Sequence, residues 1–281
     1  MPLVHDRCIC LRKFEYSETS QILTLFSRDH GVLRAIAKGA HRRTKAGASK
    51  FDGGVDLLDV GQAVFTHDPA RELSTLTEWS LREGHLELRN NLRGMYLGQY
   101  AAELAGVLIE EHDPHSALFV AMEKCLAELS TGRREEAFLG FELELLRLAG
   151  YLAELSCCVV CGQELSDREP ADFSPARGGI VCRSCLPQVA QTMPFDLRLL
   201  RLVQGLLRLP RVNGSIQRLP RLTRHQTDPI NRLILSHIEH TLGRRLRMSA
   251  YIFEKQAERR PPPQSSPGIP GGREEESRNG G

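Results

Sequence analysis

The chain has 281 residues, of which 41% are hydrophobic and 26% are charged, a composition typical of a soluble globular protein and not of a disordered one. This length has room for about two domains with an ample core. No stretch approaches the roughly 20 apolar residues that a membrane span requires, and the opening Met-Pro-Leu-Val-His-Asp-Arg lacks the pattern of a signal peptide. We therefore expect neither a membrane protein nor an exported one.

Charge is distributed unevenly along the chain, although the formal net charge is only +2. Residues 1–50 contain ten Lys/Arg and four Asp/Glu, and residues 198–260 contain fourteen and four. Two basic ends around a more acidic centre indicate contact with a polyanion at defined surfaces. Two well-solvated faces are the alternative interpretation.

Residues 6–80 have the pattern of short strands separated by turn residues. Apolar or β-branched runs of this kind predict strands over residues 7–11, 21–26, 32–37, 55–60, 62–66 and 73–79. Five or six short strands in about 75 residues favour a small closed barrel, of which the oligonucleotide-binding (OB) fold is the commonest of this size. An SH3-like barrel is the alternative.

The segment from Lys38 to Lys50 carries five positive charges and no acidic residue. A cationic loop with glycines on a barrel rim suits contact with a phosphate backbone without base readout, whereas an exposed solubilising loop is the alternative. Phe14, Tyr16 and Phe65 are candidates for stacking on bases, or else core residues. The candidate DNA-binding residues are Arg34, Lys38, Arg42, Arg43, Lys45 and Lys50.

From Asn90 onward the apolar period becomes helical. Three amphipathic helices are predicted over about 92–108, 114–129 and 138–148, the second starting at Asp113-Pro114 and the third ending at Gly150. Because each has one apolar stripe, we expect the three to pack against one another.

Two more helices are expected after residue 190. Asp196 can cap a helix that Pro210 stops, and Asp228-Pro229 can start a helix that ends at Gly243 and has His237 among its core residues. The cations that follow at once either stabilise the helix end or contact DNA or an acidic partner; they are Arg244, Arg245 and Arg247.

Four cysteines form the strongest motif in the chain. Cys158-Val-Val-Cys161 and Cys182-Arg-Ser-Cys185 are separated by 20 residues, the spacing of a four-thiolate zinc ribbon. Disulfides, a redox pair and chance are the alternatives. Four thiolates leave no open coordination position, so we expect one structural Zn²⁺. Cys157 lies beside the first pair, but only Cys158 keeps the two-residue spacing, and we expect Cys8, Cys10 and Cys125 to be core residues.

The sequence has no recognisable catalytic motif. It lacks G-x-x-x-x-G-K-[ST], G-x-G-x-x-G, H-E-x-x-H and G-x-S-x-G. We expect the acidic pairs Glu135-Glu136 and Glu142/Glu144 to be solvated on helix surfaces. Binding is thus favoured over catalysis, and the rival functions are a zinc-ribbon adaptor for acidic proteins without direct DNA binding, and a nuclease.

The order of these parts resembles the bacterial recombination mediator family RecO. The resemblance rests on LRKFEYSETSQILTLFSRDHGVLRAIAKGAHRR (11–43), ELLRLAGYLAEL (144–155) with CCVVCG, FSPARGGIVCRSC (173–185) and IEHTLGRRLRM (238–248). Cys158, Cys161, Cys182 and Cys185 match the zinc ligands of the family, and the Lys38–Lys50 loop matches its basic segment. His41 stands where relatives commonly have arginine. Some relatives lack the cysteines, which implies a structural metal.

The resemblance implies an α+β protein: an N-terminal OB-fold barrel (1–80), then an α-helical domain (81–258) with a Cys₄ zinc ribbon at 155–190, and a disordered tail (259–281). It implies a cytoplasmic, nucleoid-associated protein of recombinational DNA repair in the RecF pathway. The family binds single- and double-stranded DNA, anneals complementary strands, associates with RecR and with the acidic C-terminal tail of the single-stranded-DNA-binding protein, and helps to load RecA.

Overall fold

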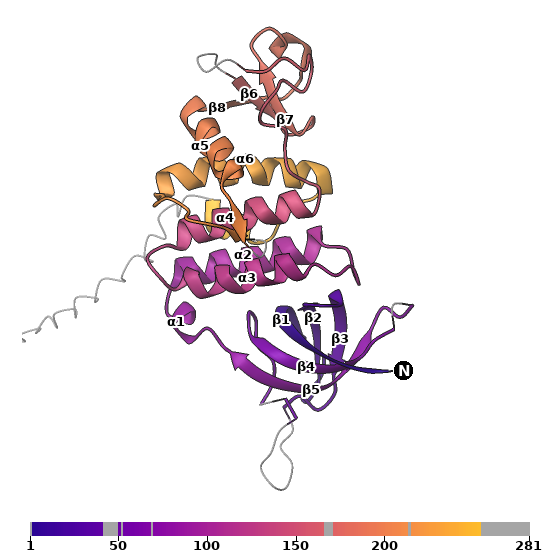
Figure 1. The fold of residues 1–281 in the computed structure, drawn as a ribbon. Coiled ribbons are helices and arrows are strands. Elements are labelled where there is room, and N and C mark those ends of the chain that lie inside the picture. Colours follow the sequence, from indigo (N-terminus) through magenta and orange to yellow (C-terminus); the bar gives the residue numbers. More distant parts are fainter. Residues whose placement is uncertain are drawn as a thin grey trace, which may run out of the picture.

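The computed structural model describes residues 2–41, 50, 51, 53–68, 70–165, 171–212 and 215–253. The predicted tail (259–281) lies outside these ranges. The protein has three layers along one axis: a β-barrel at one end, helices in the middle and a small sheet at the other end (Figure 1). This is the α+β architecture expected from the sequence.

Five strands close the barrel in the order β1-β2-β3-β5-β4, with β1 and β4 antiparallel and β3 and β5 parallel. The OB-fold expectation is confirmed. The strands are β1 (Leu3–Glu15), β2 (Gln21–Ser27), β3 (Gly31–Ala37), β4 (Val60–Thr66) and β5 (Ser74–Glu83).

The predicted strand over 55–60 is wrong. Apart from Val60, which begins β4, its apolar residues belong to a loop, where Leu58 has a positive φ of 67° that no strand accommodates. The loop is held by backbone bonds to β1, from Leu58 N–H to the Cys10 carbonyl and from Cys10 N–H to the Asp59 carbonyl, both at 2.9 Å. Burial of Val55 and Leu58 explains the apolar pattern that suggested a strand.

Strand β1 is buried on both faces, which joins the barrel to the helices. Cys8 and Cys10 point into the barrel, whereas Ile9 and Leu11 point outward into the core of the helical region. Phe26 of β2 also points outward, and its ring contacts Phe119 at 5.5 Å between centroids. The predicted domain boundary at residue 80 falls inside β5, and the division of the chain into domains stays a prediction.

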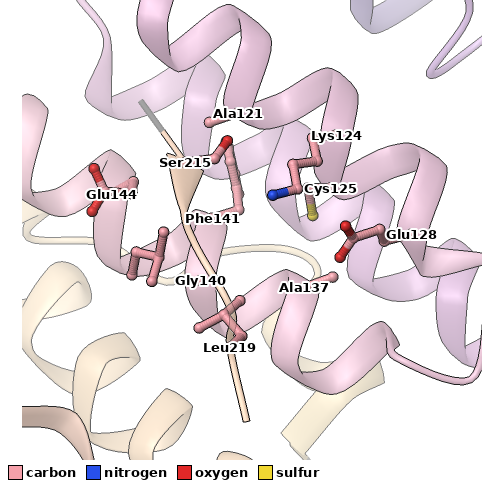
Figure 2. Close-up of a pocket in the computed structure, with 11 residues that line it drawn as sticks. Ala121, Lys124, Cys125, Glu128, Ala137, Gly140, Phe141, Glu144, Ser215 and Leu219 are labelled. Atoms are coloured by element: carbon pink, nitrogen blue, oxygen red, sulfur yellow. The ribbon is translucent and has the colours of Figure 1, made fainter. Parts of the chain in front are cut away.

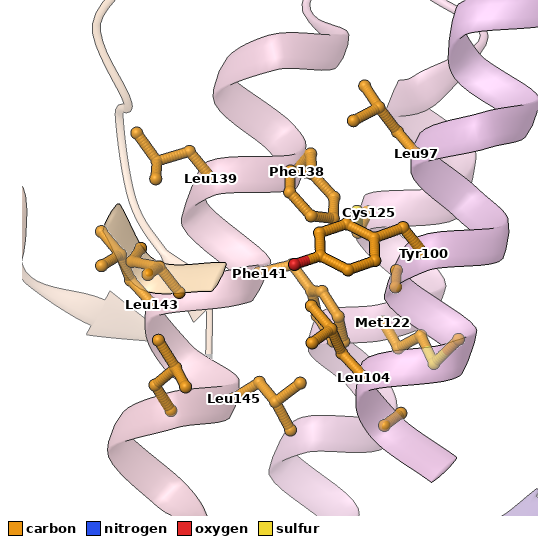
Figure 3. Packing of buried hydrophobic residues seen from close by; sticks show 14 of the residues in the cluster. Leu97, Tyr100, Leu104, Met122, Cys125, Phe138, Leu139, Phe141, Leu143 and Leu145 are labelled. Atoms are coloured by element: carbon orange, nitrogen blue, oxygen red, sulfur yellow. The ribbon is translucent and has the colours of Figure 1, made fainter. Parts of the chain in front are cut away.

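The helices form the middle layer, and their apolar stripes pack against one another as expected. Tyr100 and Phe138 stack at 5.5 Å in the centre of this core (Figure 3). None of the helices within the described ranges is both long and apolar enough to cross a membrane. The helices are α1 (Leu86–Arg89), α2 (Leu92–Leu108), α3 (Ser116–Leu129), α4 (Arg134–Leu148), α5 (Leu197–Arg208), α6 (Arg224–Leu242) and α7 (Ser249–Phe253).

Two predicted helix starts are wrong by a few residues. Helix α3 begins after His115 and not at Asp113-Pro114. Helix α6 begins after Thr223, because Thr223 and Gln226 form a capping box, and it contains Pro229 in its interior. The predicted Asp196 cap is confirmed, since its side chain accepts a hydrogen bond from Arg198 N–H at 2.7 Å.

The small sheet has the order β7-β6-β8, with β6 (Ala171–Ser174), β7 (Gly179–Cys182) and β8 (Met193–Phe195). One of its faces packs on the helices through Phe173 and Ile180. His237 of α6 lies at this contact, with its ring nitrogens 3.2 Å from the Pro175 and Tyr151 carbonyls. It is a hydrogen-bonded core histidine, as expected. The remaining short elements are η1 (Leu186–Gln188), β9 (Arg211–Val212) and β10 (Ser215–Ile216).

The expectation that the acidic pairs of α4 are solvated is wrong. Glu136, Glu142 and Glu144 are at most 1% exposed, and Glu135 pairs with Arg93 at 3.0 Å. Helix α4 is covered on several sides by α2, α3 and α6, so positions that a single amphipathic stripe assigns to solvent are inside.

Candidate nucleic-acid interface and metal centre

The outer face of β1–β3 is organised in three cross-strand rows. The first row, Ile9–Phe26–Val32, is covered by the helices. The second is Arg12–Thr24–Arg34, and the third is Phe14–Ile22–Ile36. Moving away from the helices, the face thus changes from buried apolar to cationic and then to aromatic and aliphatic.

A β-bulge at Leu11 creates the cationic row. Cys10 pairs with Leu25 and Arg12 pairs with Thr24, so Leu11 is the extra residue on β1. Without a bulge, Arg12 would lie on the same face as Cys10, inside the barrel. The bulge turns Arg12 and Phe14 outward. Sequence alternation alone did not reveal Arg12 as a surface cation of this face.

The aromatic candidates divide into two groups. Phe14 and Tyr16 are each 61% exposed at the end of β1, so their rings are available for stacking. Phe65 is fully buried in the barrel interior, so of the two interpretations offered for it the core residue is correct.

The candidate cations near the barrel are only partly within the described residues. Arg34, Lys38 and Lys50 are exposed, and none of them forms an ion pair with a described carboxylate. Arg42, Arg43 and Lys45 lie outside the described residues. His41 contacts Glu15 at 3.1 Å and the Gly53 carbonyl at 3.1 Å, and the bond to Glu15 raises the pKa of His41.

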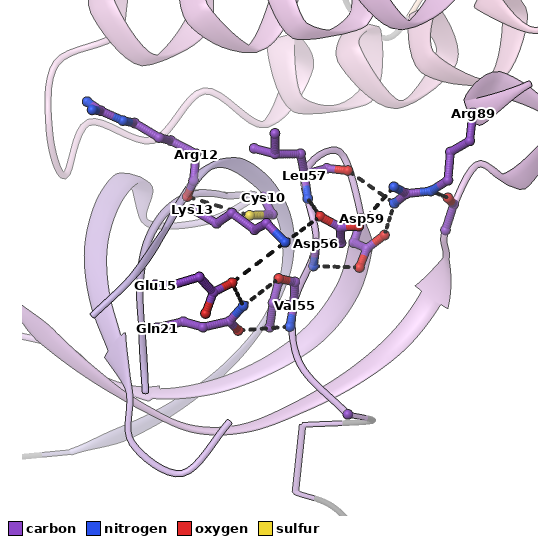
Figure 4. Close-up of polar contacts among 12 residues, drawn as sticks. Cys10, Arg12, Lys13, Glu15, Gln21, Val55, Asp56, Leu57, Asp59 and Arg89 are labelled. Atoms are coloured by element: carbon purple, nitrogen blue, oxygen red, sulfur yellow. Dashed lines mark hydrogen bonds and ion pairs between the residues drawn. The ribbon is translucent and has the colours of Figure 1, made fainter. Parts of the chain in front are cut away.

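Other cations of the barrel are engaged by its own acids. Lys13 pairs with Asp56 at 2.9 Å, and Arg89 reaches both Asp56 and Asp59 at 2.9 Å (Figure 4). These pairs tie the loop before β4 to β1 and α1. Arg12 points away from this network and has no ion pair with any described carboxylate. The fold therefore separates structural cations from cations that are available to a ligand.

A groove of about 300 Å³ lies where the barrel meets the helices; we call it the junction groove. Arg12 and Thr24 line it from the barrel, and Arg244 and Arg247 line it from the segment after α6. Arg245 is exposed and does not line it. The two basic regions that are far apart in the sequence thus meet at one site.

Two further cavities among the described residues are too small to bind an organic ligand. The cavity between α3, α4 and β10 has a volume of about 20 Å³ and is lined by Cys125, Phe141 and Ser215, among others (Figure 2). The cavity beside His237 has a similar volume and a mostly aliphatic lining. About 20 Å³ is room for a single water-sized molecule.

The four cysteines of the predicted ribbon converge. The sulfurs of Cys158, Cys161, Cys182 and Cys185 all lie within 4.8 Å of one another, and Cys161 and Cys182 are 3.8 Å apart. Zn–S bonds of about 2.3 Å in a tetrahedron place sulfurs about 3.8 Å apart. The donor set and its spacing therefore fit one tetrahedral Zn²⁺. Cys157 is outside the cluster, and Cys8, Cys10 and Cys125 are buried elsewhere as expected.

Backbone N–H groups point at the cluster. Burial acts to raise the pKa of Cys158, but hydrogen bonds from Cys182, Cys161 and Val160 N–H outweigh it and lower that pKa to about 6. The hydrogen bond with Cys182, together with burial, raises the pKa of Cys185 to about 12. Without a cation, the first thiolate opposes formation of the others, so the site is suited to a cation that neutralises all four.

A closed OB-fold barrel, followed by helices and a ribbon with four clustered thiols, defines the structural class of the protein. Comparison with known families specifies it further. Residues 1–85 match the family described as "Recombination protein O N terminal", and residues 89–250 match "Recombination protein O C terminal".

Curated relatives agree with the family match. A protein of Rhodopirellula baltica, named DNA repair protein RecO, is 35% identical over 66% of this chain and 68% of its own length. Proteins with the same name from Anaeromyxobacter sp. strain Fw109-5 and Moorella thermoacetica are 29% and 27% identical, each over 88% of this chain and over 94% and 89% of their own lengths. The chain belongs to the RecO family.

Proposed function

We propose that this protein is a DNA-binding recombination mediator of the RecF repair pathway. It anneals complementary single strands and helps to load RecA onto DNA that is coated by single-stranded-DNA-binding protein. Its proposed protein partners are RecR and the acidic C-terminal tail of that coating protein. The proposal rests on membership of the RecO family and on the names of the relatives.

The outer face of the barrel is the observation that carries the DNA-binding part. It presents Arg12 and Arg34 in one row and the exposed Phe14 in the next. A cationic strip beside an exposed aromatic ring is the combination that holds single-stranded nucleic acid, because phosphates meet the cations and bases stack on the ring. Lys38, which is exposed directly after β3, adds a further cation.

Annealing by this protein requires positive charge but no external energy source. Two DNA strands repel each other, and cations on the barrel and on the helical region can hold both at once. Base pairing then drives the reaction, so no nucleotide hydrolysis or catalytic group is required, and we propose that the protein is not an enzyme. The Cys₄ ribbon, proposed to hold one Zn²⁺, contributes a rigid support and no chemical step.

Salt dependence of single-strand binding tests this function. In Arg34→Ala/Lys38→Ala, the slope of log affinity against log salt should become shallower by about 0.7 per lost contact; the triple variant of Arg42, Arg43 and Lys45 should lose about three such contacts. Arg198→Ala, an exposed cation of α5, is the control. An unchanged slope in both test variants, with no acceleration of strand annealing by the native protein, would reject the function and favour the adaptor.

A further inference from the structure

The junction groove is lined by four separate parts of the chain. The barrel contributes Leu11, Arg12 and Thr24, the loop before β4 contributes Leu57 and Leu58, and helix α2 contributes the opposite side. The segment between α6 and α7 forms the rim with Arg244, Arg247 and Met248. The groove exists only because the barrel docks on the helices.

The groove is continuous with the cationic row of the barrel. Arg12 and Thr24 line the groove, and through the register of β1–β3 the same two residues stand beside Arg34. A ligand on the outer face of the barrel therefore reaches the groove without leaving cationic surface. Arg12 is the residue that the two sites share.

The groove is lined by cations from the rim and from the barrel. Neither Arg244 nor Arg247 forms an ion pair with a carboxylate of the described chain, and neither does Arg12. The acid in the wall, Glu103, is already used, because its two oxygens accept hydrogen bonds from Arg247 N–H and Met248 N–H at 2.8 Å. Glu103 thus fixes the backbone of the rim, and its negative charge is partly compensated by these amides.

The floor is aliphatic and open. Leu57, Leu58 and Val107 line it, and Gly106 of α2 leaves space there, because a Cβ at Gly106 would meet only Leu11 Cδ1 at 3.7 Å. Guanidinium groups bind phosphate oxygens in a bidentate manner and also stack on bases. An unstacked base can therefore lie over the floor while its phosphates meet the rim.

We infer that the junction groove is a second nucleic-acid subsite, which continues the path of a single DNA strand from the barrel face across Arg12 to Arg244 and Arg247. This inference rests on the proposed DNA binding and adds to it the path that the strand follows on the protein. Guanidiniums contributed by two different walls of one groove suit a repeating anion, and the shared Arg12 makes the strand on the barrel the nearest such anion.

Fluorescence anisotropy with oligothymidylates of two lengths tests the path, using the full-length protein. An oligomer of about 6 nucleotides is accommodated on the barrel alone, whereas one of about 20 extends beyond a single barrel site. Arg244→Ala/Arg247→Ala should make the salt slope shallower by about 1.4 for the long oligomer and leave the short one unchanged. Gly106→Gln, which fills the groove without changing charge, should weaken only the long oligomer.

Matched controls distinguish a specific effect on the groove from a general loss of positive charge and from misfolding. Arg245→Ala removes a cation between the two test arginines but outside the groove, and Gly205→Gln changes a helical glycine of α5 whose Cβ position has no neighbour within 4 Å. Both should bind the two oligomers like the native protein. Equal thermal midpoints of test and control variants show that folding is intact.

The outcomes distinguish this inference from the proposed function. If Arg34→Ala/Lys38→Ala weakens both oligomers while the groove variants weaken neither, the groove path is wrong and DNA binding by the barrel stands. If no variant weakens either oligomer, the proposed function fails as well. If the groove variants instead abolish binding of an acidic peptide, the groove belongs to a protein partner and the inference is overturned.

Discussion

The barrel and the ribbon are two small β units that dock on opposite ends of the helical layer and stabilise their other faces differently. Each presents one apolar face to the helical core, through Ile9 and Phe26 for the barrel and through Phe173 and Ile180 for the ribbon. The barrel then closes around fourteen buried apolar residues of its own, whereas the second cluster of the ribbon contains only Val181 and three of the four cysteines among the described buried residues.

This difference shows when a β unit needs a metal. A closed five-stranded barrel buries enough side chains to be stable through packing. A three-stranded sheet of three- and four-residue strands cannot do so, and small units of this kind depend on disulfides or metal. The stability of the ribbon should therefore depend on its thiolates, and that of the barrel on its contact with the helices.

Loss of the proposed Zn²⁺ should have the largest effect. Cys158→Ser, or removal of the ion with a chelator, should abolish the protection of amide hydrogens over residues 171–195 and retain it in β1–β5, because only the ribbon depends on four thiolates. Hydrogen exchange read by mass spectrometry, with metal content near one Zn²⁺ per native chain, is the measurement. Cys157→Ser is the control, since Cys157 is outside the cluster. Full ribbon protection in metal-free Cys158→Ser would contradict the comparison.

Gly31→Ala tests the contact of the barrel with the helices. Gly31 has a φ of +71°, and a Cβ there would lie 2.3 Å from the Asp113 carbonyl oxygen, so the segment before α3 must move away. We expect a loss of about 2–4 kcal/mol in the free energy of unfolding. Gly150→Ala has a similar φ of +78° with no neighbour within 4 Å and should lose only about 1 kcal/mol. Urea denaturation measures both; equal losses would mean that backbone strain, and not the contact, sets the effect.

Two neighbouring acids of α4, Glu142 and Glu144, test how the helical core on which both β units pack accommodates charge. Glu142 is fully buried, and its described polar partner is the Asn231 amide, oriented to donate at 3.0 Å. Burial raises its pKa well above the usual value. The folded state therefore resists charging of Glu142, and its stability falls as pH rises from about 4 toward the raised pKa.

Glu142→Gln should remove this pH dependence. Because the neutral amide avoids the buried charge, we expect a gain of about 1–2 kcal/mol at pH 8 and no gain at pH 4. Glu144→Gln is the matched control and should lower the stability instead of raising it. Glu144 is paired with Arg147 at 2.8 Å and with Arg211, and loss of its charge leaves these cations unpaired. Thermal midpoints across pH measure both variants, and a destabilised Glu142→Gln at pH 8 would refute the assignment.

The smallest effect is expected at His41, near the start of the Lys38–Lys50 loop. The Glu15 carboxylate raises the pKa of His41, so this contact contributes stability below about pH 6.5, which is lost as pH rises through the raised pKa. Glu15→Gln should lower the pKa of His41, as measured by NMR titration of the ring protons. Glu18→Gln removes an exposed carboxylate of the β1–β2 turn and should not. A His41 titration that is identical in all three proteins would exclude Glu15 as the cause.

Local patterns determined the features that depend on neighbouring residues in the chain. The β-strand runs, the Asp196 cap, the helix end at Gly243 and the spacing of Cys158 and Cys161 are all set within a few residues, so the barrel, the helices and the ribbon followed from the sequence. Errors occurred where a non-local contact overrode the pattern. The apolar run at 55–60 is a loop because β1 binds its backbone.

Only the tertiary structure decided which cations and acids have partners and which surfaces meet. A bulge at Leu11, stabilised by pairing with β2, turned Arg12 outward. Packing of α4 inside other helices buried Glu142 and Glu144. Docking of the barrel brought Arg12 to the groove of Arg244 and Arg247. A sequence specifies local geometry through short-range sterics and hydrogen bonds, whereas these three outcomes depend on segments that are far apart in the chain and come together only in the folded protein.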